Sequence, residues 1–302
     1  MTNCEVRLCG VTLKNPVIAA SGTFGYGQEM QEFIDVSRLG AISTKAVTLY
    51  PRQGNPAPRI AETPSGCINS VGLQNPGVEA FLKEELPRLK RMGTVVIANI
   101  AGSDIQEYEQ TAKELKGCGA EMIELNISCP NVKQGGMAFG TSGSCAGEVT
   151  EAVKKHCKVP LIVKLSPNVT DIVEIAKACV SAGADALSLI NTVAAMAVDP
   201  YTRRPILKNI NGGLSGPCIK PIGLKKVFDV AQSVDVPIIG MGGIIKGTDA
   251  IEYMLCGASA VQVGTANLMD PGSCIRIIEE IEDYMASQGI SDINSLVGGL
   301  IV

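Results

Sequence analysis

The sequence predicts an α/β fold, a (β/α)₈ TIM barrel with extended loops at the C-terminal face of the strands. Eight short apolar runs rich in Val, Ile and Leu are separated, in most cases, by segments with helical periodicity. Four of these runs follow directly on a Gly-Ala pair, as expected where a helix ends at glycine and a strand begins. Eight such units in 302 residues are typical of a closed barrel.

The apolar runs are the predicted strands, and they lack the polar alternation of a half-exposed sheet. Parallel strands covered on both faces have this composition. The predicted strands span 15–21, 41–47, 94–101, 122–128, 160–166, 185–191, 236–242 and 259–265. The segments with helical periodicity include 79–91, 104–117, 145–156, 170–182, 247–256 and 273–286.

A doubly wound open sheet is the alternative, but the glycine spacing does not favour it. Neither "GMGGII" nor "GTFGYG" has the GxGxxG spacing of a dinucleotide-binding turn. Three long connections, 48–78, 129–144 and 192–216, follow predicted strands at the face where barrel enzymes build their sites. No linker interrupts the chain, so we expect residues 1–302 to form one domain.

Composition narrows the classes of function. The chain is 46% hydrophobic and 19% charged, which is typical of a globular protein. Its net charge of -4 argues against broad nucleic-acid binding, which usually has a basic footprint. No apolar stretch approaches the roughly 20 residues that span a bilayer, and the start lacks the layout of a signal peptide. We therefore expect a cytoplasmic protein with no membrane attachment.

The eleven cysteines do not predict a metal site. Their number is odd, no pair has CxxC spacing, and the chain has a single histidine, His156. Most lie in apolar or helical contexts, where cysteine acts as a small hydrophobic residue. We expect no metal, and reduced thiols that are mostly structural.

Polar side chains at the strand ends predict a binding site. Three amides and two lysines would meet at one mouth of the barrel, although each alone could be a satisfied turn or cap group. Burying unpaired amides and ammonium groups is costly, so their convergence favours a ligand. These five residues are Lys45, Asn99, Asn126, Lys164 and Asn191.

The last two strand ends are rich in glycine and predict a phosphate group on the ligand. "GMGGI" at 240–244 and "VGTA" at 263–266 both precede predicted helices, whose first backbone N–H groups can face an anion. The alternative is that the glycines only permit tight turns between strand and helix.

Lys164 indicates the kind of ligand, because it lies inside the apolar run "LIVKLSP" and needs an anionic partner. A reduced flavin carries negative charge at its N1 edge, and Asn99 and Asn126 would suit the amide and carbonyl edge of the isoalloxazine ring. A flavin-free barrel with a Schiff base on Lys164 is the competing interpretation.

Segments along nearly the whole chain carry a resemblance to a known family. They are "LKNPVIAASGTFGYG", "KAVTLYPRQGNPAPRI", "NSVGLQNPG", "NISCPNVKQGG", "VKLSPN", "INT", "GGLSG", "GMGGI" and "VGTAN". With these segments the sequence is similar to the catalytic subunits of class 1B dihydroorotate dehydrogenases, which are FMN-containing (β/α)₈ barrels. The resemblance implies an NAD-dependent oxidoreductase acting on a CH–CH bond, which oxidises (S)-dihydroorotate to orotate in de novo pyrimidine (UMP) biosynthesis.

The resemblance assigns two sets of binding residues. The set implied for FMN is Ser21, Lys45, Ala46, Asn99, Asn126, Lys164, Ile190, Gly216, Gly242, Gly243, Gly264 and Thr265. The set implied for the substrate is Lys45, Asn69, Ser70, Val71, Gly72, Leu73, Asn126, Asn191 and Thr192.

The same resemblance makes Cys129 the catalytic base. The hydride would leave C6 for N5 of FMN, while Cys129 takes the proton from C5. A thiol with an ordinary pKa near 8.5 can serve if the site lowers that value. The membrane-bound class of the family has serine here, so a cysteine favours class 1.

Class 1B further implies a partner subunit that carries FAD and a [2Fe–2S] cluster and passes electrons to NAD⁺. The assembly would contain two chains of each kind around a homodimer of this chain. The alternatives are a class 1A homodimer that reduces fumarate, a flavin barrel similar to tRNA-dihydrouridine synthases, and a subunit that binds flavin or a partner without catalysis.

Overall fold

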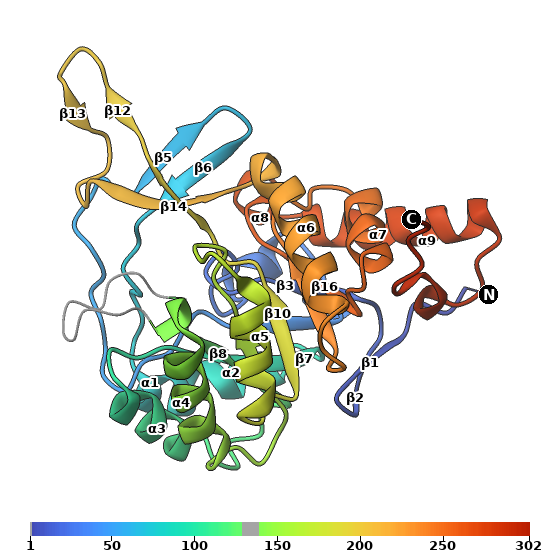
Figure 1. The fold of residues 1–302 in the computed structure, drawn as a ribbon, viewed down its shortest axis with the longest axis horizontal. Helices are drawn as coiled ribbons and strands as arrows, with labels where there is room; N and C mark the ends of the chain where they lie inside the picture. The colour runs from blue at the N-terminus through green and yellow to red at the C-terminus, as the bar shows by residue number, and fades with distance from the viewer. Residues whose placement is uncertain (1, 129–138) are drawn as a thin grey trace.

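The computed structural model describes residues 2–128 and 139–302, and its centre is a closed barrel of eight parallel strands (Figure 1). Each strand lies within one of the eight predicted runs, which confirms the predicted barrel. In order around the barrel they are β10 (Ala186–Leu189), β15 (Ile238–Met241), β16 (Ala260–Val263), β3 (Val17–Ala19), β4 (Ala41–Ser43), β7 (Val95–Ile100), β8 (Met122–Asn126) and β9 (Leu161–Lys164).

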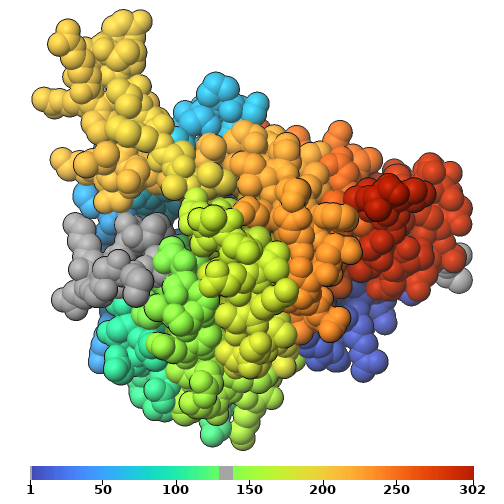
Figure 2. Space-filling view, in the orientation of Figure 1, coloured from blue at the N-terminus to red at the C-terminus, as the bar shows by residue number. Residues whose placement is uncertain are grey.

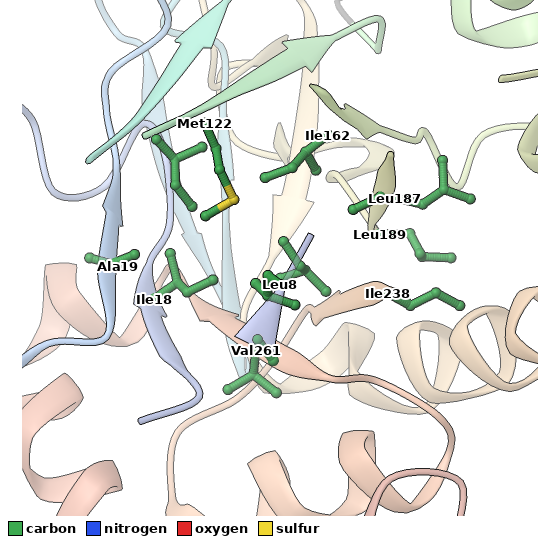
Figure 3. Close-up of a cluster of buried hydrophobic side chains, with 14 of the residues drawn as sticks. Leu8, Ile18, Ala19, Met122, Ile162, Leu187, Leu189, Ile238 and Val261 are labelled. Carbon is green, nitrogen blue, oxygen red and sulfur yellow. The ribbon is translucent and has the colours of Figure 1, made fainter. Parts of the chain in front are cut away.

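The N-terminal hairpin closes one end of the barrel. Strands β1 (Val6–Leu8) and β2 (Val11–Leu13) pair antiparallel, and their side chains Val6, Leu8 and Leu13 are buried. Figure 3 shows Leu8 among apolar side chains that come from the barrel strands, including Ile18 and Val261. Burying a leucine in this way stabilises the fold by about 2 kcal/mol. The apolar plug leaves the opposite, carboxyl ends of the strands for a site.

Helices surround the barrel (Figure 1). Six of the helical segments match the predicted ones, but periodicity did not predict α6, whose first turns contain Pro221 and Gly223. In the described part of the chain, no helix is long and apolar enough to cross a membrane. The helices are α1 (Val78–Ala80), which continues through a π-helical turn (Phe81–Glu85) into α2 (Leu86–Lys90), then α3 (Ile105–Glu114), α4 (Gly143–Lys154), α5 (Ile172–Ser181), α6 (Lys220–Ala231), α7 (Gly247–Leu255), α8 (Ala266–Met269) and α9 (Ser273–Gln288).

The first strand-to-strand connection departs from the repeating unit. Between β3 and β4 the chain forms two 3₁₀ helices, Glu29–Glu32 and Val36–Arg38, in place of an α-helix. The second of these is capped by Asp35, whose carboxylate accepts from the backbone N–H of Ser37. A short segment rich in glycine can return to the next strand without a full helix.

Two of the three long connections combine into one antiparallel sheet. Connection 48–78 supplies β5 (Ile60–Thr63) and β6 (Gly66–Asn69), and connection 192–216 supplies β11 (Val193–Met196) and β14 (Asn211–Ser215). Their order is β11-β14-β6-β5, with Gly213 opposite Asn69. We call this four-stranded sheet the roof sheet. The sequence predicted loops here, because these strands are short and two of them contain glycine.

A narrow arm extends from the roof sheet. It is the hairpin of β12 (Val198–Asp199) and β13 (Arg204–Pro205), which stands clear of the body in Figures 1 and 2. The arm carries exposed apolar side chains, of which Tyr201 is 95% exposed.

We expect Gly223→Ala to destabilise the fold. A Cβ atom at Gly223 would lie 1.9 Å from the hydroxyl of buried Tyr253, so the ring would have to move. Overpacking of this kind lowers the free energy of unfolding by about 2 kcal/mol.

The matched control is Gly147→Ala, another glycine inside a helix, where the nearest atom would be 3.7 Å away. There the added methyl group should raise the free energy of unfolding by up to about 1 kcal/mol. Urea denaturation of both variants checks the pair, and equal effects would contradict this account of Gly223.

Candidate active site

A pocket of about 370 Å³ lies at the carboxyl ends of the barrel strands, beneath the roof sheet. Its walls come from the ends of barrel strands, such as Lys164 of β9 and Met241 of β15. Its cover includes Asn69 of β6 and Gly213 of β14. The predicted loops therefore enclose the site rather than lying apart from it.

The structure brings nearly all the predicted site residues to this pocket. Eleven of the twelve residues expected to hold FMN line it, and so do all nine residues expected around the substrate. Asn99 is the exception, because it is fully buried and is not part of the lining. The predicted base, Cys129, lies outside the described residues. The individual roles of these residues stay predictions.

A buried carboxylate lies next to Lys164. The Nζ atom of Lys164 is 4.0 Å from Oε2 of Glu124 and 3.2 Å from Oγ of Ser21. The side chain of Lys164 is 5% exposed and that of Glu124 is 0% exposed. The anionic partner that the sequence required for Lys164 is thus present within the barrel itself.

Hydrogen bonds hold Glu124 as a carboxylate. Its Oε1 accepts from Ser188 and Gln262, each at 2.7 Å, and its Oε2 accepts from Ser43 at 2.7 Å and Asn99 at 2.6 Å. Burial raises the pKa of Glu124, but the Lys164 ammonium group and the hydrogen bonds outweigh burial and hold that pKa below its usual value. The carboxylate is therefore ionised at neutral pH.

The carboxylate also determines which way two buried amides face. Because a carboxylate only accepts, the NH₂ groups of Asn99 and Gln262 must point towards Glu124. Their oxygens, Oδ1 of Asn99 and Oε1 of Gln262, are buried and have no hydrogen-bond partner among the described residues. Gln262 lines the pocket, so its free acceptor is available to a ligand that brings a donor.

A second polar cluster lies where β8 ends. Oδ1 of Asn126 accepts from the backbone N–H of Ser128 at 3.2 Å, from its hydroxyl at 2.8 Å, and from the amide of Asn191 at 3.4 Å. The Asn191 amide also donates to the Ser128 hydroxyl, and the hydroxyl of Tyr108 holds the backbone oxygen of Asn126. The two predicted substrate amides are therefore fixed relative to each other.

Lys45 is the second cation of the pocket. Burial, followed by the nearby guanidinium group of Arg59, lowers the pKa of Lys45. An anionic ligand would relieve both effects, since it would compensate the charges that burial penalises. The site thus favours a carboxylate or phosphate group.

The loop 69–77, the substrate loop, is held by Asn75. Its side-chain oxygen accepts from the backbone N–H groups of Thr48 and Gly77, and its NH₂ group donates to Oγ1 of Thr48 and the backbone oxygen of Leu73. Gly72 has φ +77°, and a Cβ atom there would lie 2.7 Å from the backbone nitrogen of Asn55. Close approach of two backbone segments therefore shapes this loop.

The glycines of the last two strand ends have different reasons to be glycine. Gly243 has φ +71°, and a Cβ atom there would lie 2.8 Å from the backbone oxygen of Gly216, so a tight turn requires it. Gly264 has no such need, because its nearest neighbour would be Cβ of Ala20 at 3.7 Å. The missing side chain at Gly264 leaves space at the pocket wall.

These residues fit FMN. The pocket offers a buried cation, a buried acceptor on Gln262, and space at Gly264, and its walls include apolar side chains such as Ile190 and Met241. The pyrimidine edge of a flavin combines carbonyl oxygens with one N–H donor, which complements a cation and free acceptors. The ribityl phosphate requires an anion site of the kind that the glycine turns provide.

Sequence reasoning missed the residues that support this site. Glu124, Gln262, Ser43 and Ser188 all lie within apolar runs, and all four are buried. The signal was the same as for Lys164, namely a polar residue inside a buried strand. The sequence predicts the role of Lys164 from this signal, and the same signal applies to its partner, Glu124.

Comparisons with known proteins agree with this geometry. The sequence model of the dihydroorotate dehydrogenase family matches residues 3–285. The chain belongs to the dihydroorotate dehydrogenase family. Relatives named "Dihydroorotate dehydrogenase B (NAD(+)), catalytic subunit" include those of Alkaliphilus oremlandii, 56% identical over 99% of each chain, and Geotalea daltonii, 55% identical over 98% of this chain and 97% of the relative. Another, from Petrotoga mobilis, is 54% identical over 99% of each chain.

Membership makes this chain an oxidoreductase and confirms the resemblance seen in the sequence. It also removes the support for a Schiff-base barrel or a tRNA-dihydrouridine synthase, because the match covers almost the whole chain.

We expect Asn75→Ala to loosen the substrate loop. The change removes four hydrogen bonds and leaves the buried N–H groups of Thr48 and Gly77 without acceptors, which should lower the free energy of unfolding by about 2–3 kcal/mol. The neighbouring amide Gln74 is exposed, so Gln74→Ala should change it by less than about 0.5 kcal/mol. Chemical denaturation measures both, and a mild effect of Asn75→Ala would argue against this anchoring role.

Proposed function

We propose that this chain is the catalytic subunit of a class 1B dihydroorotate dehydrogenase, which oxidises (S)-dihydroorotate to orotate in UMP biosynthesis. One observation carries the proposal. The residues that the family assigns to FMN and substrate come from distant parts of the chain, and the structure gathers nearly all of them around one pocket. The names of the relatives, each matched over nearly its whole length, support the same activity and the link to NAD⁺.

FMN would lie against the barrel mouth and, when bound, supplies a hydride acceptor at N5. Lys164 would present positive charge to the ring, and Ser21 would orient the ammonium group through their 3.2 Å contact. Gln262 offers a buried acceptor beside it. The glycine turns around Gly242 and Gly264 would receive the phosphate.

Dihydroorotate would lie beneath the roof sheet, between the substrate loop and the ends of β8 and β10. Lys45 would pair with its carboxylate, since a buried cation needs an anion. Asn69, Asn126 and Asn191 would donate to and accept from the ring amides, because their side chains carry both kinds of group. This arrangement would fix the C5–C6 bond for removal of a proton and a hydride from neighbouring carbons.

Cys129 is the proposed base for the C5 proton. It lies outside the described residues and directly follows Ser128, which lines the pocket. Lys45 and Lys164 bring positive charge to the pocket, and positive charge near a thiol favours the thiolate.

We expect the purified protein to be yellow and its flavin to bleach on anaerobic addition of dihydroorotate. Cys129→Ala should keep FMN but slow the bleaching by about 10²–10⁴-fold at neutral pH, because positioned general bases contribute rate factors of this size. Stopped-flow absorbance measures the rate.

Cys145→Ala is the control, since Cys145 lies in α4 outside the pocket lining. Bleaching of Cys129→Ala at the rate of this control would remove the base assignment. A colourless protein that cannot be loaded with FMN would overturn the proposed function as a whole.

The electrons would leave through a partner subunit that carries FAD and a [2Fe–2S] cluster and reduces NAD⁺. The words "catalytic subunit" in the relatives' names support a second chain. The heterotetramer with a homodimer of this chain at its core is part of the same proposal. A cytoplasmic location and a single domain over residues 1–302 stay predictions from the sequence.

We expect the tagged chain, purified from the cells that produce it, to bring along an iron–sulfur flavoprotein. The complex should reduce NAD⁺ with dihydroorotate, whereas the chain alone should be reduced by the substrate without passing electrons to NAD⁺. A chain that purifies alone and turns over with fumarate would instead support class 1A.

A further inference from the structure

We propose that Glu124 is a positioning residue of this active site, whose buried carboxylate is the counter-charge that holds the ammonium group of Lys164 at the pocket. This inference rests on the FMN site of the proposed function. It assigns to a residue inside the barrel, outside the pocket lining, a part in binding the cofactor.

The carboxylate is fixed from several directions. The four donors that reach it lie on four strands, with Ser43 on β4, Asn99 on β7, Ser188 on β10 and Gln262 on β16. Each oxygen accepts two hydrogen bonds, which occupies the lone pairs of an ionised carboxylate. With β8 and β9, six of the eight barrel strands contribute to the network. Glu124 is therefore held far more rigidly than a surface carboxylate.

Lys164 depends on this charge. Its ammonium group is nearly fully buried, and Glu124 is its ion-pair partner among the described residues, at 4.0 Å. The groups that face the pair from β4, β7, β10 and β16 are uncharged hydroxyls and amides, and Ser21, which follows β3, is uncharged as well. An unpaired buried ammonium group is costly, and the carboxylate compensates its charge.

The arrangement gives the two residues different tasks. Lys164 presents its charge to the ligand, and Glu124 holds the ammonium group in place without touching the ligand. In Glu124→Gln the shape is nearly conserved but the counter-charge is lost. The ammonium group should then be held less firmly at the pocket, and FMN should bind more weakly.

The experiment is a titration of the apoprotein with FMN at neutral pH, followed by quenching of flavin fluorescence. We expect the Kd of Glu124→Gln to be about tenfold higher than that of wild type, because Lys164 has lost its buried counter-charge. Glu124→Asp keeps the charge and should follow wild type. Ser188→Ala removes one hydrogen bond from the same carboxylate without changing charge, and it should also follow wild type.

The pair variant tests the coupling. Lys164→Met removes the ammonium group and should itself weaken FMN binding, so adding Glu124→Gln to it should raise the Kd no further. A Kd of Glu124→Gln equal to that of wild type, or a further rise in the pair variant, would overturn the proposal.

Folding of the variants gives a further test. If Glu124→Gln alone does not fold, the pair variant should recover soluble protein, because both buried charges are then removed. Insolubility of both would assign Glu124 to the folding of the barrel and overturn the proposal. Failure of the wild-type protein to bind FMN would instead overturn the proposed function, so the two failures are distinguishable.

Discussion

The ion pair of Glu124 and Lys164 is the constraint around which the interior of the barrel is arranged. Two charges with almost no exposure to solvent require hydrogen bonds from most of the strands. This explains why buried strands contain Ser43, Ser188 and Gln262, which an apolar barrel core would not need. At the amino end, Leu8 lies among apolar side chains of the barrel strands, including Ile18 and Val261 (Figure 3).

The barrel strands position the side chains of the site, and the long connections cover the pocket. Strand ends place Lys164, Asn126 and Gly242 with little freedom, since each is the last residue of a hydrogen-bonded strand or directly follows one. The roof sheet adds residues that would contact the substrate, and Asn75 ties the substrate loop to Thr48, in the connection that follows β4. A rigid floor with a cover made by separate segments is well suited to a site that must hold a cofactor permanently and exchange a small substrate.

Much of this could be predicted from sequence because the relevant signals are local. The eight strands were found from composition and length, and the lysines and amides from their place at strand ends. What was missed depends on partners distant in sequence. Glu124 is explained only by donors from four other strands, α6 was obscured by Pro221 and Gly223, and the roof sheet forms from two segments that each look like loops. Asn99 was expected at the ligand, but its NH₂ group is engaged by Glu124.

The roof sheet has a consequence for the order in which parts of the chain fold. Its central pairing joins β6 to β14, and the contact between Asn69 and Gly213 spans 144 positions of the chain. Contacts between such distant residues carry a high entropic cost and form late in folding. As the chain is synthesised, four barrel strands, β7 to β10, emerge after the substrate loop before β14 is available to pair with β6. The cover over the pocket therefore forms only after most of the barrel wall that it encloses.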